Sequence, residues 1–483
     1  MKIIRYCTLI FLMAYTMASY AQVASKLQLP FDKLQNNSYG TSIANHGNFT
    51  IVGSYFQNNI HLFYLGKYVR TYTATDAFGF SSLGVSVAIS QDFIVSGAYQ
   101  YNYGANLKAG AAFVISKIGN EFNTTFKQRL SPSVKQDGEK YGYDVAISGN
   151  WLAVTSPERN NGRGAVEVFQ LINGNWNSFG YLDMSHVPLG AQFGYSVAMD
   201  GDRMIVGAKR EKAVYVYKRD GITWGYEDKI NSRWPSFGHD VDICQKESVK
   251  KIIIGAPDDF NGTGRAAVYK FNNINWVPFN SDTTKNILRS NGFSGSFGHS
   301  VALERGWAVV GEIYSMKTIS SDATGEVHHF AHENNMFVRK GTLLTGDGDK
   351  NTALGYAVDL QDQWVVATDK DFDAVLTRSG SEGVAYRTPF YDVFNNRDTR
   401  MGSDITDLNL SNEVSIYPNP ASEKINISSN NTIVSVTAVN ASSNSVKLSV
   451  ENNTVDISQL PSGIYMLNIQ TESNMVTEKL IVK

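Results

Sequence analysis

Polar and aromatic side chains recur directly after a repeated glycine in this sequence of 483 residues. Equivalent positions of a repeat return to equivalent places in a repeating fold, so we expect these side chains to lie near one another. They suit hydrogen bonding and stacking on a ligand, and His239 beside Asp240 could form an acid/base pair. The alternative is a role in packing between repeats. The candidates are Tyr143, Asp144, Tyr195, His239, Asp240, His299 and Tyr356.

A second candidate site is a tyrosine-rich segment. Tyr99, Tyr101 and Tyr103 alternate with polar residues, among them Asn102 and Asn106. Tyrosine and asparagine on a loop suit stacking on a sugar or contact with a protein. The alternative is a loop whose exposed aromatic side chains have no further role.

Three groups of residues could attract a cation, but none has the ligand spacing of a metal site. They are Asp258, Asp259 and Asn261, then Asp347 to Asp349, and then His328, His329 and His332. The first group is typical of a polar turn, and the second of a solvated loop. His328 and His329 are neighbours on an expected strand and must face opposite ways. We therefore expect no metal and no cofactor.

Local signatures of catalysis are missing from the sequence. It contains no Gly-x-Ser-x-Gly, no His-Glu-x-x-His, no P-loop and no cysteine metal cluster. We assign no catalytic residue. The residues do not decide whether the protein is an enzyme, but they favour a protein without catalytic activity.

The repeated glycine marks a structural repeat that must position these side chains. The motif is an aromatic residue or Leu, then Gly, any residue, a small residue or Asp, and Val or Ile. Its glycines are Gly40, Gly84, Gly142, Gly194, Gly238, Gly298 and Gly355. A second anchor follows as Gly53, Gly97, Thr155, Gly207, Gly255, Gly311 and Thr368. The offset is 13 residues in six repeats and 17 in the fifth, which indicates a rigid unit joined by variable loops.

Apolar residues within each repeat alternate with a period of two, which predicts β-strands. Residues 194–199 and 204–206 flank a tight turn, and two further strands follow at 213–217 and 224–226. Seven repeats of four antiparallel strands predict an all-β, seven-bladed β-propeller over residues 22–390. Residues 26–30 resemble the outer strand at 127–132, so we expect the N-terminal segment to complete the seventh blade.

These residues resemble the FG-GAP repeat propellers typified by the integrin α-subunit head. The resemblance is fullest at Phe237-Gly238, Gly255-Ala256-Pro257 and Gly264, and it extends over about residues 26–390. Integrin-type repeats often carry an Asp-x-Asp-x-Asp-Gly calcium loop, whereas the matching turns here are short, as at 90–92 and 304–306. Calcium binding is therefore not expected from the resemblance.

The first residues indicate export. Lys2 and Arg5 precede an apolar run that ends before Ser19-Tyr20-Ala21, as in a cleaved signal peptide of residues 1–21. The run is too short to span a membrane, so we expect no transmembrane segment after cleavage. Of the two cysteines, Cys7 lies in this segment, and Cys244 alone remains to the mature chain. An internal disulfide is thereby excluded.

A second domain follows the propeller. Residues 391–413 are polar and are predicted to be a linker, and seven short alternating segments in 414–483 predict a small Ig-like β-sandwich. This region resembles the C-terminal sorting domain of Bacteroidetes type IX (Por) secretion. The resemblance rests on Pro418, Asn419, Pro420, Gly463, Tyr465, Lys479 and Lys483. It implies the type IX machinery as a partner and a secreted or outer cell-surface location.

The charge balance narrows the functions further. With 43 Lys and Arg against 45 Asp and Glu, the chain is not a basic nucleic-acid binder. Our first hypothesis is a binding or adhesion propeller for an extracellular glycan or protein. The alternatives are a hydrolase or lyase acting on extracellular polysaccharide and a structural subunit of a surface assembly. A propeller can host all three functions, so the fold does not choose among them.

Overall fold

The computed structural model describes most of the propeller and of the C-terminal unit. The described residues are 25–27, 29, 38–75, 79–104, 107–280, 287–290, 295–315, 324–345, 353–361, 364–370, 384–389, 398–401, 415–417, 421–428, 432–440, 445–451, 453–471 and 475–482. The predicted signal peptide, Pro418 to Pro420, Lys483 and Asp347 to Asp349 lie outside these ranges. No helix within them is long and apolar enough to span a bilayer.

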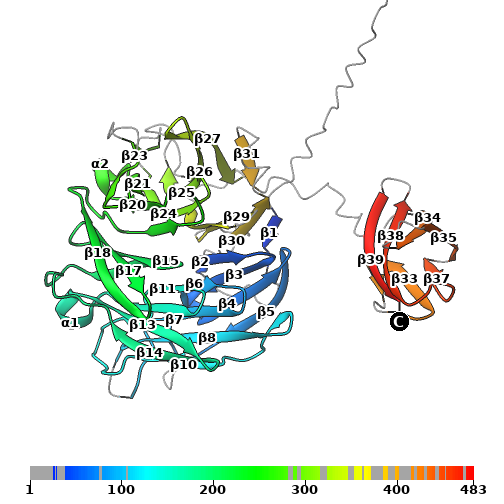
Figure 1. Ribbon diagram of the computed structural model, residues 1–483, viewed down its shortest axis with the longest axis horizontal. Coiled ribbons are helices and arrows are strands. Elements are labelled where there is room, and N and C mark those ends of the chain that lie inside the picture. The colour runs from blue at the N-terminus through cyan, green and yellow to red at the C-terminus, as the bar shows by residue number, and fades with distance from the viewer. Residues whose placement is uncertain are drawn as a thin grey trace, which may run out of the picture. The chain divides into compact units, whose positions relative to one another are not determined.

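Seven sheets form the first unit, up to Ser403, and the four main strands of each are antiparallel and correspond to one sequence repeat (Figure 1). Blade 1 is β2 (Tyr39–His46), β3 (Phe49–Ser54), β4 (Asn59–Tyr64) and β5 (Lys67–Thr73). Blade 2 is β6 (Leu83–Ile89), β7 (Phe93–Ala98), β8 (Ala111–Ile118) and β10 (Gln128–Leu130), with β9 (Glu121–Phe122) on β8. Blade 3 is β11 (Val145–Ser148), β12 (Trp151–Ser156), β13 (Ala165–Ile172) and β14 (Asn175–Tyr181). Blade 4 is β15 (Phe193–Asp200), β16 (Arg203–Ala208), β17 (Ala213–Asp220) and β18 (Thr223–Asn231).

The remaining blades follow the same order. Blade 5 is β19 (Val241–Cys244), β20 (Lys251–Ala256), β21 (Arg265–Phe271) and β22 (Trp276–Pro278), with β23 (Ile287–Leu288) also on β21. Blade 6 is β24 (Phe297–Glu304), β25 (Trp307–Ser315), β26 (Thr324–Glu333) and β27 (Met336–Thr345). Blade 7 is β28 (Leu354–Gln361), β29 (Trp364–Asp369) and β30 (Val384–Pro389). Among the described residues, single turns of helix occur at η2 (Tyr55–Gln57), α1 (Arg159–Gly162) and α2 (Asp259–Gly262).

The first strands of the blades make contact in a closed cycle. Their order is β2, β6, β11, β15, β19, β24, β28 and again β2. The ring is closed by β1 (Ser25–Leu27), which pairs with β30 so that Leu27 lies opposite Ala385. The predicted seven-bladed propeller is thus confirmed, and so is the N-terminal strand on its last blade.

The two glycine anchors exist because neighbouring blades approach closely. A Cβ atom on Gly97 of blade 2 would lie 1.9 Å from the carbonyl oxygen of Gly142 in blade 3. Gly142 itself has a φ of +79°, which L side chains rarely adopt. The 13-residue offset therefore marks the distance along a blade between two contact points with its neighbours.

The small or acidic residue two positions after the motif glycine forms a hydrogen bond with the backbone of the next blade. Ser42 Oγ donates to the carbonyl oxygen of Gly84 at 2.9 Å, and Ser196 Oγ donates to that of Gly238 at 3.0 Å. Where the residue is aspartate, a carboxylate accepts instead: Asp144 Oδ2 accepts the N–H of Val197 at 2.7 Å. Backbone groups at the blade junctions thereby gain hydrogen-bond partners.

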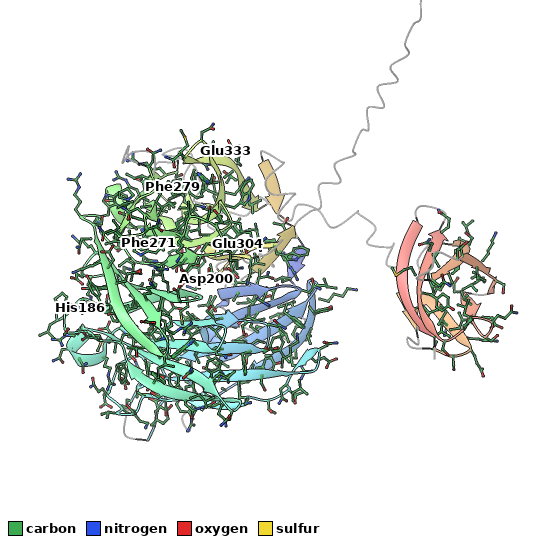
Figure 2. The ribbon with its side chains drawn as sticks, viewed as in Figure 1. His186, Asp200, Phe271, Phe279, Glu304 and Glu333 are labelled. Atoms are coloured by element: carbon green, nitrogen blue, oxygen red, sulfur yellow. The ribbon has the colours of Figure 1, made fainter. Side chains whose placement is uncertain are left out.

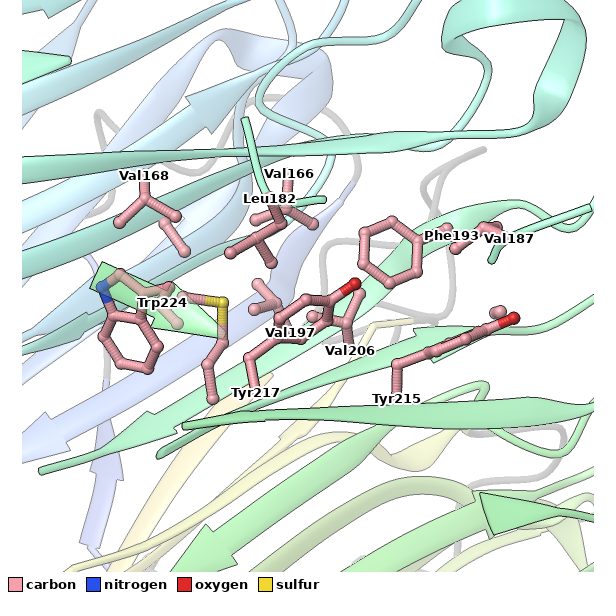
Figure 3. Close-up of a cluster of buried hydrophobic side chains, with 14 of the residues drawn as sticks. Val166, Val168, Leu182, Val187, Phe193, Val197, Val206, Tyr215, Tyr217 and Trp224 are labelled. Atoms are coloured by element: carbon pink, nitrogen blue, oxygen red, sulfur yellow. The ribbon is translucent and has the colours of Figure 1, made fainter. Parts of the chain in front are cut away.

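The hydrophobic core lies between blades rather than at one centre. Val166 and Val168 of blade 3 pack against Val197, Tyr215 and Tyr217 of blade 4 (Figure 3). Their side chains are buried, and Trp224 extends this cluster outward. Each blade is therefore stabilised by its neighbours, as expected of a repeat fold.

One feature of the predicted linker differs from expectation. Within residues 391–413, β31 (Asp398–Met401) pairs in parallel with Thr342–Thr345 of β27. It forms a fifth strand on the outer edge of blade 6. An exposed edge strand invites further pairing, and the polar sequence of β31 gave no sign of this role.

The C-terminal unit, Asp404–Lys483, consists of two sheets. One contains β32 (Ser415–Tyr417), β33 (Lys424–Ser428), β37 (Thr454–Asp456) and β36 (Val450–Glu451). The other contains β35 (Ser445–Leu448), β34 (Ile433–Asn440), β38 (Gly463–Thr471) and β39 (Met475–Val482). Ile425 and Val455 of the first sheet share one core with Val436 and Leu467 of the second, as in a small β-sandwich.

Candidate functional site

A β-bulge turns the residue after the motif glycine toward the central channel. In blade 4 the pairing register shifts between Phe193 and Ser196, and the N–H of Tyr195 donates to the carbonyl of Gln192 at 3.1 Å. The same shift occurs at the start of blades 1, 2, 6 and 7. Bulges re-aim a side chain, and here Tyr195 lines the channel instead of an interface between blades.

Six rings from consecutive blades form a continuous row at one mouth of the channel. We call this row the aromatic arc, and its members are Tyr99, Tyr143, Tyr195, His239, His299 and Tyr356. In that order, neighbouring ring centroids are 5.8, 5.2, 5.3, 4.9 and 4.8 Å apart. All six side chains are partly exposed, so their faces or edges remain open to a ligand.

The two histidines of the arc are held as neutral bases. His239 Nδ1 lies 3.0 Å from the carbonyl oxygen of His299, and His299 Nδ1 lies 3.0 Å from that of Tyr356. A carbonyl can only accept, so each Nδ1 carries the proton and each Nε2 carries a lone pair. Burial lowers the pKa of His299 to about 4 and holds that of His239 well below its usual range.

Lysine side chains lie over the tyrosines of the arc. Lys209 Nζ is 4.6 Å from the ring centre of Tyr195, and Lys370 Nζ is 4.6 Å from that of Tyr356. Among the residues that the structure describes, neither lysine has a carboxylate partner. The mouth therefore combines aromatic faces, neutral imidazoles and positive charge that a ligand can meet.

Below the arc the channel contains a cavity of about 450 Å³. Four aspartates line it, and each accepts a backbone N–H from the next blade. The hydrogen bonds are Val197 to Asp144, Val301 to Asp240, Leu303 to Asp242 and Asn45 to Asp359, at 2.7 to 2.8 Å. Burial raises the pKa of Asp240 to about 7 and those of Asp144 and Asp359 to about 6.

His239 and Asp240 do not form the acid/base pair that their adjacency suggested. The imidazole bonds the carbonyl of His299, whereas the carboxylate accepts the N–H groups of Val241 and Val301 at 3.0 and 2.8 Å. Both residues lie in the turn just before β19, and the two side chains reach different parts of blade 6, the His299 carbonyl and the Val301 N–H. Both still line the same cavity.

The three tyrosines of the tyrosine-rich segment lie in two different places. Tyr99 joins the aromatic arc, but Tyr101 and Tyr103 lie together around Arg129 on blade 2. Tyr101 is buried, and its hydroxyl accepts a hydrogen bond from Arg129 Nη1 at 2.7 Å. The arc thus contains one member of this segment, not three.

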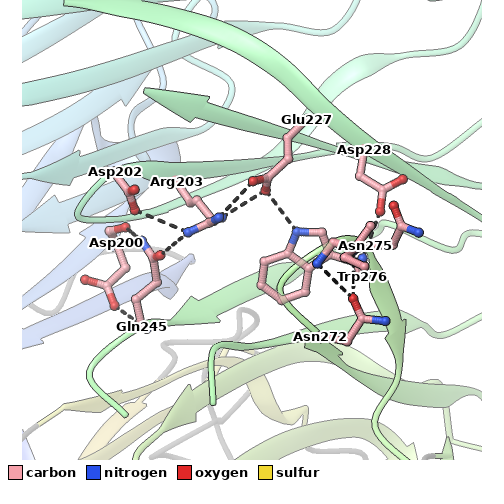
Figure 4. A network of polar contacts seen from close by, with 10 residues as sticks. Asp200, Asp202, Arg203, Glu227, Asp228, Gln245, Asn272, Asn275 and Trp276 are labelled. Atoms are coloured by element: carbon pink, nitrogen blue, oxygen red, sulfur yellow. Dashed lines mark hydrogen bonds and ion pairs between the residues drawn. The ribbon is translucent and has the colours of Figure 1, made fainter. Parts of the chain in front are cut away.

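The opposite mouth of the channel is a smaller polar cavity of about 310 Å³. Asp200 and Glu304 line it (Figure 2). Lys246 Nζ pairs with Glu304 at 2.9 Å. Nearby, the buried Arg203 donates to both carboxylate oxygens of Glu227 at 2.8 and 2.9 Å and to Gln245 at 2.9 Å (Figure 4). This network ties blade 4 to blade 5, and its charges are already paired.

Several residues of the groups that could attract a cation have partners within the protein. Asp258 accepts a hydrogen bond from Ser236, and Asp259 pairs with Arg265 at 3.0 Å, so the two carboxylates engage different partners. His328 contacts two buried glutamates that the sequence did not single out. Glu312 and Glu326 lie in different strands, and only their register reveals that they meet.

In the C-terminal unit, the described sorting-motif residues lie on the second sheet. Gly463 begins β38, and the hydroxyl of Tyr465 donates to the carbonyl of Pro461 at 2.9 Å. Lys479 lies on β39, opposite Met466. The Leu-Pro-Ser-Gly-Ile-Tyr motif therefore leads into β38, and the hydrogen bond of its own tyrosine holds the segment before the strand.

Comparison with known families agrees with both parts of this description. Residues 415–483 match the family described as "Secretion system C-terminal sorting domain", and residues 188–217 match the FG-GAP repeat. The second match spans the Gly194 and Gly207 anchors of blade 4. The chain is thus a propeller protein that contains an FG-GAP repeat in blade 4 and a type IX sorting domain at residues 415–483. Such a domain interacts with the secretion machinery and gives a secreted or cell-surface protein of a Bacteroidetes-type bacterium.

Whole-chain comparisons add little. The sequence matches no curated protein. Among solved structures, one similar chain is "KlHsv2 with loop 6CD replaced by a Gly-Ser linker". It has 11% sequence identity and a TM-score of 0.43, and the match covers 73% of this chain and 97% of that one.

Proposed function

We propose that the mature protein is an exported binding propeller that recognises an extracellular glycan at the aromatic arc. The observation that carries this proposal is the row of six partly exposed rings from six blades at one mouth of the channel. Sugar rings present C–H faces that stack on tyrosine, and hydroxyl groups that can donate to a neutral imidazole nitrogen. Adhesion to a glycan-bearing surface would follow from this recognition.

The lysines support a preference for acidic sugars. Lys209 and Lys370 flank the arc, and no described acidic side chain neutralises them. A carboxylate or sulfate group on a sugar could pair with both, and such charge-assisted bonds are stronger than neutral ones. We therefore expect uronic-acid or sulfated glycans to bind better than neutral glycans of the same backbone.

An array of neutral, uronic-acid and sulfated glycans, probed with the secreted protein, tests this function. We expect retention on acidic glycans that weakens as salt rises, because exposed charge pairs are screened. A double variant, Lys209→Met with Lys370→Met, should lose the preference for acidic glycans but keep the fold. The absence of glycan binding, combined with binding to a surface protein, would contradict the proposal.

A polysaccharide hydrolase or lyase is the second candidate, favoured by one observation. Asp240 lines the channel, and burial raises its pKa to about 7, a value suited to a general acid. Its two oxygens already accept backbone N–H groups, which supports a structural role instead. Release of reducing ends or unsaturated sugars from an acidic polysaccharide, lost in Asp240→Asn, would favour the enzyme.

A further inference from the structure

Two buried glutamates face each other across blade 6. Glu312 near the end of β25 pairs directly with Glu326 near the start of β26, and His328 follows two residues later on the same face of β26. Their relative exposures are 0%, 5% and 0%. Like charges directly opposite each other destabilise a sheet, and burial increases the cost of each charge. A nearby positive charge or a bound proton therefore stabilises this pair.

The propeller fold does not require this acid pair. The same cross-strand position in the other blades holds small, neutral or singly charged pairs. They are Ser54 and Asn59, Ala98 and Ala111, Ser156 and Ala165, Ala208 and Ala213, Ala256 and Arg265, and Asp369 and Val384. Of the seven described pairs at this position, the blade 6 pair alone joins two acidic side chains.

Blade 1 contains a neutral counterpart of the same arrangement. His61 occupies the position of His328, with Nε2 3.0 Å from Ser54 Oγ and Nδ1 2.8 Å from Thr71 Oγ1. In blade 6, His328 Nε2 lies 2.5 Å from Glu312 Oε2, and Nδ1 lies 3.3 Å from Thr342 Oγ1. A histidine at this position is thus fully compatible with a neutral blade, and blade 6 adds two carboxyl groups to it.

The three donor groups converge on one point. Their ligand atoms all lie within 4.8 Å of one another, and His328 Nε2 is 3.7 Å from Glu326 Oε2. Ligand atoms about 2.1 Å from a tetrahedral Zn²⁺ are separated by about 3.4 Å. Small side-chain shifts would bring one nitrogen and two oxygens to that spacing. An imidazole with two carboxylates is a donor set for first-row divalent ions.

Arg339 provides the competing cation. Its guanidinium contacts Nδ1 of His328 and donates to Thr342 Oγ1 at 2.8 Å. Arg339 is only partly buried, so it can move outward. The Nδ1 proton of a metal-bound imidazole could then be donated to Thr342, as metal-ligating histidines usually require.

We propose that Glu312, Glu326 and His328 bind a divalent first-row transition-metal ion, such as Zn²⁺ or Mn²⁺, within blade 6. The ion exchanges with the Arg339 guanidinium as the counter-charge of the two glutamates. Because the ligands come from β25 and β26 and are buried, the ion fastens these strands together and supports blade 6. This site is distinct from the aromatic arc and does not depend on the proposed glycan binding.

Metal titration of the full secreted chain tests the site. After treatment with a chelator, the protein is titrated with Zn²⁺ and Mn²⁺ by calorimetry, and its melting temperature is measured with and without the ion. We expect one ion per chain and a higher melting temperature in the wild type. Failure of both ions to bind, or to raise the melting temperature, would overturn the proposal.

Matched variants separate this site from adventitious binding. Glu312→Ser with Glu326→Asn copies the blade 1 pair, so it should fold without metal and bind at least tenfold more weakly. Glu326→Gln, which preserves shape, provides the same comparison if the double variant does not fold. Glu139→Gln changes a buried glutamate paired with Arg159 in another part of the propeller and should bind like the wild type. Equal binding by all of these variants would contradict the assignment.

Discussion

Replacing His299 with glutamine should change how the stability of the propeller depends on pH. Burial in the aromatic arc lowers the pKa of His299 to about 4, whereas the unfolded chain retains a value near 6.5. Between these values, the unfolded chain binds a proton that the folded chain excludes. The stability contributed by the neutral imidazole is therefore fully present above pH 6.5 and is lost as pH falls. At pH 5 the loss amounts to about 2 kcal/mol.

The order of stability of His299→Gln and the wild type should reverse between pH 8 and pH 5. At pH 8, glutamine loses or weakens the hydrogen bond from Nδ1 to the Tyr356 carbonyl, which costs about 1 kcal/mol. At pH 5, the variant avoids the protonation loss of about 2 kcal/mol. We thus expect His299→Gln to be less stable than the wild type at pH 8 and more stable at pH 5.

Urea unfolding followed by tryptophan fluorescence at pH 5, 6, 7 and 8 measures this difference. All seven tryptophans lie between residues 151 and 364, so the signal reports on the propeller and not on the C-terminal unit. Tyr195→Phe is the control, because it removes one hydroxyl group from the same arc and leaves both imidazoles in place. A free-energy difference that is constant with pH for His299→Gln would refute the burial of a neutral imidazole.

Three further perturbations test other parts of the structure. Gly97→Ala places a Cβ atom 1.9 Å from the Gly142 carbonyl and should lower the free energy of unfolding by about 1 to 3 kcal/mol. Gly225→Ala is the control and should change this free energy little, because its Cβ atom would lie 3.9 Å from the Lys218 carbonyl, an ordinary contact distance. Equal effects of the two variants in urea unfolding would contradict close contact between the blades. Asp240→Asn should show the opposite pH trend to His299→Gln. Because the pKa of Asp240 is raised to about 7, the protonated carboxyl group stabilises the fold below pH 7, and this contribution is lost above pH 7. The free energy of unfolding of the variant should therefore rise by about 3 kcal/mol relative to that of the wild type between pH 5 and pH 8. No rise would mean that the carboxylate is ionised throughout this range. Deleting residues 22–38 removes β1 and should broaden and lower the thermal unfolding transition; an unchanged, cooperative transition would show that β1 does not close the ring.

The fold could be predicted from the sequence because its constraints are local and repeated. The motif glycine needs a positive φ, and its partner 13 residues later must lack a Cβ atom against the next blade, as Gly97 does. Each requirement recurs in most blades, so the glycine pattern can be recognised in a single sequence. The N-terminal strand was also predictable, because its apolar pattern matches that of an outer strand.

The sites were less predictable because they depend on register and on bulges. The gathering of Tyr143, Tyr195 and the two histidines followed from their shared place in the repeat. The separation of His239 from Asp240, and of Tyr99 from Tyr101, depends on side-chain directions that periodicity does not fix. Glu312 and Glu326 meet only because a particular register pairs them. No single-sequence motif encodes such a pairing.

The most direct test of the account is the affinity of the best acidic glycan for the wild type and for Tyr195→Ala, measured by calorimetry at one salt concentration. Tyr64→Ala, which removes an exposed tyrosine of blade 1, is the matched control. The account predicts about tenfold weaker binding for Tyr195→Ala, the equivalent of about 1.4 kcal/mol of lost stacking, and unchanged binding for Tyr64→Ala. Equal affinity of Tyr195→Ala and the wild type would contradict recognition at the aromatic arc.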